Sequence, residues 1–113
     1  YQLCKSHGIP DSNIILMLAD ELPANARNPN RNRMTANGGR TNLYTEDIEI
    51  DYRGDEVTVD NLVKVLLGKQ HGTKALYSDE NSHVLVYWTG HGGDSFFKFQ
   101  DLEEITSTQI ANV

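Results

Sequence analysis

The sequence predicts an α/β fold in which a mainly parallel sheet is flanked by helices. Two short stretches, residues 13–19 and 84–89, are apolar on both faces, which is typical of buried parallel strands. Between them an amphipathic segment begins near Thr58 and ends at Gly68, as a helix packed on a sheet would. Strand, helix and strand in this order indicate a parallel sheet with right-handed crossovers.

Local signals predict the remaining elements. Residues 45–52 alternate between apolar and acidic side chains, which favours a half-buried strand. Residues 96–99 are aromatic apart from one lysine and predict a short strand. The central helix should begin with Thr58 as its N-cap. We expect its buried stripe to consist of Val59, Leu62, Val63 and Leu66.

The two ends of the sequence carry incomplete helices. Residues 1–8 resemble the last two turns of a helix, with Gly8 just past its end. At the other end, Thr106 and Gln109 have the spacing of a capping box, and the sequence stops before a second turn is complete. We therefore expect residues 1–113 to be part of a single domain that is truncated at both ends.

Composition limits the classes of function. The net charge of −6 and the isoelectric point near 5.0 argue against nucleic acid as a partner. No apolar run approaches 18 residues, so the sequence predicts no membrane span. Residues 20–43 lack periodicity and hold a basic cluster. A solvated surface is the simplest interpretation of this loop, while a substrate loop or a partner contact stays open. The cluster comprises Arg27, Arg31, Arg33 and Arg40.

The second apolar stretch leads into a histidine set among glycines, Gly90-His91-Gly92-Gly93. Open α/β sheets bind ligands at the carboxyl ends of their strands. A histidine there exchanges a proton near neutral pH, and neighbouring amides can bind an anion. We therefore predict that His91 is a general base beside an oxyanion hole to which Gly92 contributes. The alternative is a tight turn whose histidine only satisfies a backbone group.

His91 has no evident nucleophile within the sequence. Cys4 lies on the early helix and is interpreted as a small packed residue. Ser95 follows His91 closely but lacks the strained turn that usually presents a serine nucleophile. We expect the catalytic partner to lie outside these 113 residues.

A second candidate site is acidic. Glu49 and Asp51 share one face of the predicted strand, and Asp11 precedes the first apolar strand. Three carboxylates brought together repel one another unless a hard cation such as calcium neutralises them. The alternative is a solvated outer face. A third and weaker candidate is the pair Asp20 and Glu21, at the carboxyl end of the first apolar strand.

Several segments form an ordered set of motifs that covers nearly the whole sequence. Two of them are Thr89-Gly90-His91-Gly92-Gly93-Asp94 and Phe97-Lys98-Phe99-Gln100-Asp101, and the others are residues 8–12, 18–21, 49–54 and 56–59. This set resembles the catalytic subunits of GPI transamidases, a branch of the legumain-like cysteine peptidases with a caspase-like three-layer fold. The segment from Phe97 to Asp101 and the glycine before His91 separate that branch from legumain proper.

The resemblance implies roles for individual residues. His91 matches the catalytic histidine of the family, and the amide of Gly92 would contribute to the oxyanion hole. The nucleophilic cysteine of the family would follow residue 113, and an asparagine that orients the histidine would precede residue 1, so the fragment alone would be inactive. A structural calcium ion is also implied, with Asp11, the carbonyl of Ile14, Glu49 and Asp51 as the matching ligands.

The resemblance also implies a reaction and its partners. The cysteine would cleave the C-terminal GPI-attachment signal of a precursor protein and form a thioester, and the ethanolamine amine of the GPI lipid would then take the acyl group. The other subunits of the transamidase would be partners, and the protein would lie in the endoplasmic reticulum lumen, associated with the membrane through the complex. Relatives commonly carry a cysteine bonded to a partner subunit where this sequence has Ala24.

Two other functions stay open from the sequence. A legumain-like endopeptidase would cut after asparagine without transfer to an amine. A non-catalytic caspase-like binding module would retain His91 without using it, and no cysteine would follow the next apolar strand.

Overall fold

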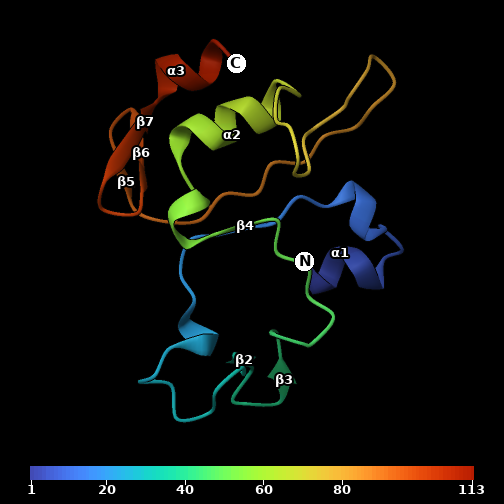
Figure 1. Ribbon diagram of the computed structural model, residues 1–113, viewed down its shortest axis with the longest axis vertical. Coiled ribbons are helices and arrows are strands. Elements are labelled where there is room, and N and C mark those ends of the chain that lie inside the picture. Colours follow the sequence, from blue (N-terminus) through green and yellow to red (C-terminus); the bar gives the residue numbers. More distant parts are fainter. The chain divides into compact units, whose positions relative to one another are not determined.

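The computed structural model describes residues 1–113, and the chain divides into two compact units, Tyr1–Gly54 and Asp55–Val113 (Figure 1). Both units contain helices and strands, so the predicted α/β class is confirmed. The first unit contains the one parallel strand pair, whereas the other two sheets are antiparallel. The two units are described separately below.

The first unit opens with helix α1 (Gln2–Ser6), followed by the 3-10 helix η1 (Asp11–Asn13). Gly8 ends α1 as predicted, with a φ of +86° and its amide donating to the carbonyl of Lys5 at 2.9 Å. A left-handed conformation of this kind favours glycine, which has no Cβ to clash with the preceding turn.

The parallel pair joins β1 (Met17–Leu18) to β4 (Tyr52–Arg53), with Tyr52 buried. Both strands are shorter than the predicted strands over residues 13–19 and 45–52. The amide of Leu16 donates to the Asp51 carboxylate at 2.8 Å, while its carbonyl accepts from the amides of Asp51 and Tyr52 at 3.0 and 3.2 Å. Backbone pairing therefore reaches Leu16 through its carbonyl alone, and the ladder begins at Met17. The alternation of partly buried Ile48 and Ile50 with exposed Glu49 persists without strand pairing.

The loop between these strands is more ordered than its sequence predicts. It contains the 3-10 helix η2 (Leu22–Ala24) and a hairpin of β2 (Thr35–Ala36) and β3 (Thr41–Asn42). The hairpin turn has three consecutive residues with positive φ, Asn37, Gly38 and Gly39. Asparagine and glycine adopt this conformation more readily than other residues. Isolated short hairpins have too little apolar patterning to be recognised from periodicity.

The second unit begins within the short 3-10 helix η3 (Gly54–Glu56) and is built on α2 (Val59–Leu66). The hydroxyl of Thr58 accepts a hydrogen bond from the amide of Asn61 at 3.1 Å, which confirms the predicted N-cap. Gly68 follows the helix with a φ of +65°. Leu62 and Val65 are the buried side chains of α2, so the predicted stripe identified Leu62 and missed Val65.

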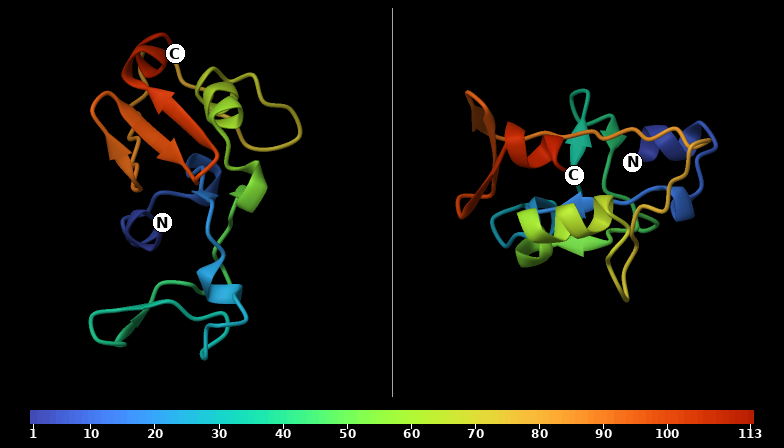
Figure 2. Two further views of the ribbon diagram at one scale, coloured as in Figure 1. Left: turned by 90° about the vertical axis from the view of Figure 1, so that its left-hand side faces the viewer. Right: turned by 90° about the horizontal axis from the view of Figure 1, so that it is seen from above.

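An antiparallel sheet of β5 (Gly92–Gly93), β6 (Phe96–Phe99) and β7 (Glu103–Thr106) completes this unit (Figure 2). The rings of Trp88 and Phe97 stack at 4.7 Å between centroids, and Phe99 meets both edge-on. Ile105 pairs with Phe97 across the sheet and is only 1% exposed. This aromatic face is the core of the sheet.

The last helix, α3 (Ser107–Ala111), begins at the end of β7 (Figure 1). Its capping box is complete, because the amide of Gln109 donates to the Thr106 hydroxyl at 3.2 Å and the amide of Thr106 donates to the Gln109 side chain at 2.8 Å. The predicted start of this helix is confirmed. The predicted strand over residues 96–99 is confirmed as β6.

The interpretation of residues 84–89 as a buried parallel strand is wrong for this structure. The segment is unpaired, and Leu85 and Tyr87 are 83% and 85% exposed. A buried parallel strand needs a neighbour for its backbone and a layer over each face. Here β1 and β4 pair only with each other, while Trp88 alone of this segment joins the aromatic face. The apolar composition of residues 84–89 indicated a preference for the strand conformation, but it did not show whether a neighbouring strand would be present.

Glu103 ties the sheet to α2. Its carboxylate accepts a hydrogen bond at 2.8 Å from the amide of Val59, the first residue of the helix. A negative charge here also favours the helix dipole. We expect Glu103→Gln, in the full-length protein, to speed hydrogen exchange in the first turn of α2 about two- to five-fold, equivalent to 0.3–1 kcal/mol. Glu104→Gln is the matched control, and equal exchange in both variants would contradict the role of Glu103.

Candidate active site

His91 lies at the mouth of a hairpin, immediately before β5. The amide of Lys98 donates to its carbonyl at 2.8 Å, so the backbone of His91 is held to β6 while its side chain is exposed. The hairpin turn is Asp94-Ser95, and Ser95 has a φ of +64°. The sheet therefore fixes the backbone position of His91, and its imidazole is accessible to solvent or a ligand.

The amide of Gly92 points away from the sheet. In an antiparallel pair, residues that exchange hydrogen bonds alternate with residues that exchange none. The bond from Lys98 to His91 makes these two a hydrogen-bonded pair, so the next pair, Gly92 and Phe97, is not hydrogen-bonded. Because β5 is the edge strand, the Gly92 amide is directed outward. It is available to an anion beside His91, as an oxyanion donor must be.

The glycines around His91 have no Cβ atoms and so leave space for neighbouring aromatic rings. A Cβ on Gly90 would lie 2.9 Å from the Phe97 ring, and a Cβ on Gly93 would overlap the Phe96 ring. At Gly92 the obstacle is backbone, because the Phe96 carbonyl oxygen would lie 2.9 Å away. The sequence alone indicated the amides of these residues as possible anion donors. The structure adds a steric requirement for glycine, which comes from Phe96 and Phe97.

Neither Ser95 nor Cys4, the two side chains considered in the sequence analysis, supplies a nucleophile to His91. The hydroxyl of Ser95 donates to the neighbouring Asp94 carboxylate at 3.2 Å, within the turn. Cys4 is a partly buried free thiol on α1, in the first unit. Ser95 does not hydrogen-bond to the imidazole. The interpretation of Cys4 as a packed side chain agrees with its partial burial.

The acidic candidates lie in the first unit, where Tyr1 connects two of them. Its hydroxyl donates to the Asp11 carboxylate and accepts from the amide of Glu49 at 3.2 Å. Lys5 lies 2.7 Å from the other Asp11 oxygen, and this hydrogen bond raises the pKa of the lysine. Sequence reasoning missed Tyr1 and Lys5, because a terminal helix gave no sign that its side chains reach Asp11.

The ligands implied for calcium fit the ion by type but are not gathered around one point. All four positions offer oxygen, which calcium prefers. Asp11 is engaged by Lys5 and Tyr1, and Asp51 accepts from the amide of Leu16. The structure contains no group of three or more acidic, histidine or cysteine side chains that could hold a metal ion. The expected calcium site therefore stays a prediction.

The third candidate pair is exposed. Glu21 lies 3.8 Å from the guanidinium of Arg53, in a surface ion pair that bridges the ends of β1 and β4. Asp20 is exposed beside it. Such pairs contribute little stability, and nothing in this geometry adds to the weak signal of the sequence.

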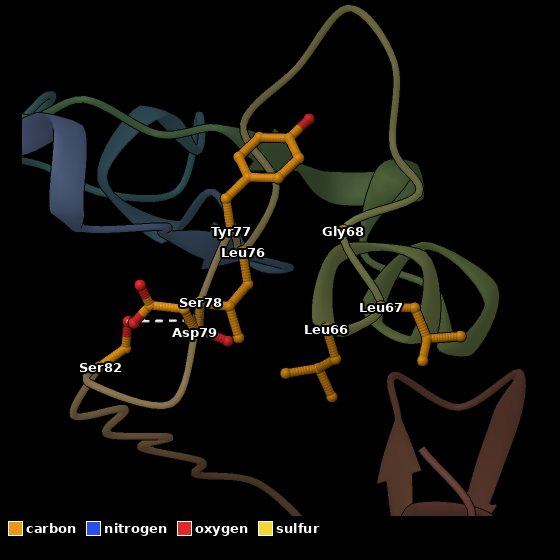
Figure 3. A pocket seen from close by; sticks show the side chains of 8 residues that line it. All are labelled: Leu66, Leu67, Gly68, Leu76, Tyr77, Ser78, Asp79 and Ser82. Carbon is orange, nitrogen blue, oxygen red and sulfur yellow. Dashed lines mark hydrogen bonds between the residues drawn. The ribbon is translucent and has the colours of Figure 1, made fainter.

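A hollow of about 430 Å³ lies between the end of α2 and residues 76–82 (Figure 3). Leu66 and Leu67 line one side, and a turn closed by Asp79 and Ser82 lines the other. Hydrogen bonds from the Asn81 amide and the Ser82 hydroxyl lower the pKa of Asp79. It is therefore ionised at neutral pH. Neither His91 nor Gly92 lines this hollow, so it is not the candidate active site.

The chain belongs to the peptidase C13 family, which it matches over residues 1–113. It is similar to a Drosophila melanogaster protein (54% identity over 99% of this chain and 33% of the relative) and to one of Caenorhabditis elegans (52%, 98% and 36%). The GPI-anchor transamidase of Mus musculus is 47% identical over 99% of this chain and 30% of its own length. The chain thus spans about a third of these relatives.

Gly92 offers a test of the hairpin geometry. Gly92→Ala forces a Cβ against the Phe96 carbonyl, so the backbone has to shift. Overpacking of this kind costs about 1–3 kcal/mol. We expect a lower midpoint of thermal unfolding in the full-length protein and a loss of activity. Asp94→Ala in the adjoining exposed turn is the control, and an unchanged midpoint in Gly92→Ala would contradict the observed β5–β6 register.

Proposed function

We propose that the chain is part of the catalytic subunit of a GPI transamidase, an enzyme of the cysteine-peptidase type. The supporting observation is that a chain of the C13 peptidase family carries an exposed histidine beside an outward-facing backbone amide. His91 lies at the mouth of a hairpin, and the Gly92 amide follows it. The activity, substrates and partners proposed for the whole protein are inferred from the names of relatives that are about three times as long as this chain.

The proposed reaction is acyl transfer in two steps. A cysteine thiolate, supplied by residues outside these 113, attacks the carbonyl carbon of the precursor at its GPI-attachment site. The Gly92 amide donates to the oxyanion that forms, and the C–N bond then breaks while His91 protonates the leaving amine. In the second step His91 takes a proton from the GPI ethanolamine amine as it attacks the thioester, and the thiolate leaves.

The proposed enzyme has protein and lipid partners and a cellular location. The partners are the other transamidase subunits, precursor proteins with a C-terminal GPI signal, and the GPI lipid. The site of action is the lumen of the endoplasmic reticulum, with membrane association through the complex. The longest helix described here, α2, has eight residues, whereas about 20 apolar residues span a bilayer, so no helix of this chain could cross a membrane.

Thiol labelling of the full-length protein tests the catalytic pair. We expect an acyl-type thiol probe to label one cysteine, and His91→Ala to slow labelling about 10²–10⁴-fold because the general base is lost. His83→Ala, another exposed histidine of the same unit, is the control. Labelling that is indifferent to His91, or no labelled cysteine after residue 113, would overturn the enzyme assignment in favour of a binding module.

A product analysis then separates transfer from hydrolysis. The full-length complex is given a precursor with and without hydrazine as the amine acceptor, and products are identified by mass spectrometry. A hydrazide at the attachment site is expected for a transamidase, since the thioester is open to amines. A free carboxylate in both reactions would instead indicate a legumain-like endopeptidase.

We also propose a structural calcium ion held by Asp11, the Ile14 carbonyl, Glu49 and Asp51. The support is their oxygen donors and their shared location in the first unit. Binding requires Asp11 to leave Lys5. We expect millimolar calcium to raise the unfolding midpoint of the full-length protein, by about 2–4 °C per kcal/mol of binding energy gained. Asp51→Asn should abolish this shift while Asp20→Asn retains it, and an unshifted native protein would refute the site.

A further inference from the structure

The loop between β1 and β4 is positively charged, whereas the rest of the chain is negatively charged. From Leu22 to Thr45 the sequence has four arginines and no aspartate or glutamate. These add +4 in a chain whose net charge is −6, so the remaining residues together carry −10. None of the four guanidinium groups forms an ion pair or a hydrogen bond. Positive charge is therefore concentrated in one segment and is not neutralised there.

Asparagine side chains hold this segment in shape. Asn28 donates to the carbonyls of Pro23 at 3.2 Å and Arg33 at 3.1 Å, which joins the start of the segment to its middle. The Asn42 side chain accepts from the amide of Met34 at 3.1 Å and donates to the carbonyl of Tyr44 at 2.7 Å. Together with η2 and the β2–β3 hairpin, these bonds give the segment a defined surface.

That surface contains a hollow of about 450 Å³, within the range of ligand pockets. Arg27 and Arg33 are its charged lining, while Leu22 and Met34 supply apolar contact; the other lining residues are Asn25, Asn28, Asn30 and Thr35. Both arginines are exposed. The guanidinium group presents several donors in a planar fork that matches a carboxylate.

We propose that this hollow, which we call the arginine pocket, is a docking site for an acidic segment of a partner protein. An aspartate or glutamate would pair with Arg27 and Arg33, and a neighbouring aliphatic side chain would lie against Leu22 and Met34. The mixed lining favours a peptide over a membrane surface, because the pocket offers no aromatic anchor for the bilayer interface. The absence of acidic residues from Leu22 to Thr45 removes local repulsion of such a segment.

Site-specific photocrosslinking in the full-length protein tests this proposal. A photoreactive phenylalanine analogue replaces Thr35, which lines the pocket, and the same analogue at Glu80 in the other unit controls for random contact. Crosslinked peptides are identified by mass spectrometry. We expect the Thr35 position to capture one peptide of net negative charge with an aliphatic residue, and the Glu80 position not to capture it.

Charge variants decide whether the pocket binds this peptide through its arginines. The double variant Arg27→Gln, Arg33→Gln should reduce the adduct at least ten-fold with an unchanged unfolding midpoint, whereas Arg40→Gln, outside the pocket, should retain it. An undiminished adduct, a peptide without excess acidic residues, a lipid adduct or no adduct would each overturn the proposal. Labelling of the catalytic cysteine should be the same in both variants, so this result is independent of the proposed transamidase activity.

Discussion

The position of His91 depends on one backbone hydrogen bond, from the amide of Lys98 to the carbonyl of the histidine. This bond sets the β5–β6 register, and the register in turn directs the Gly92 amide outward. The aromatic face of Trp88, Phe97 and Phe99 stabilises the same register from one side of the sheet. The packing of these rings therefore supports the backbone that carries His91 and Gly92, the proposed general base and oxyanion donor.

The elements that could be predicted from the sequence are those with strong local determinants. Thr58, with its hydroxyl on the Asn61 amide, and the capping box at Thr106 both specify helix starts within four residues of chain. The glycine-rich turn and His91 were recognised for similar local reasons. Glu103 was not, because its partner at Val59 lies 44 residues away and no periodicity links the two.

The failures of prediction have a common physical origin. Residues 84–89 have a strong preference for a strand, but a strand requires partners that its own sequence does not describe. In the first unit, the Asp51 carboxylate takes the Leu16 amide and shortens the predicted ladder. Both outcomes depend on pairing between segments far apart in sequence, which local composition and periodicity do not describe.

The two units also show different ways of holding functional side chains. In the second unit a β-hairpin and aromatic packing orient His91 and the Gly92 amide. In the first unit, asparagine side chains bond to backbone groups between η2 and the β2–β3 hairpin, where Arg27 and Arg33 line a hollow. An arginine on a loop ordered in this way loses less conformational entropy on binding than one on a mobile loop. An asparagine-rich, acid-free segment is therefore suited to recognise carboxylates even though its sequence shows no periodicity.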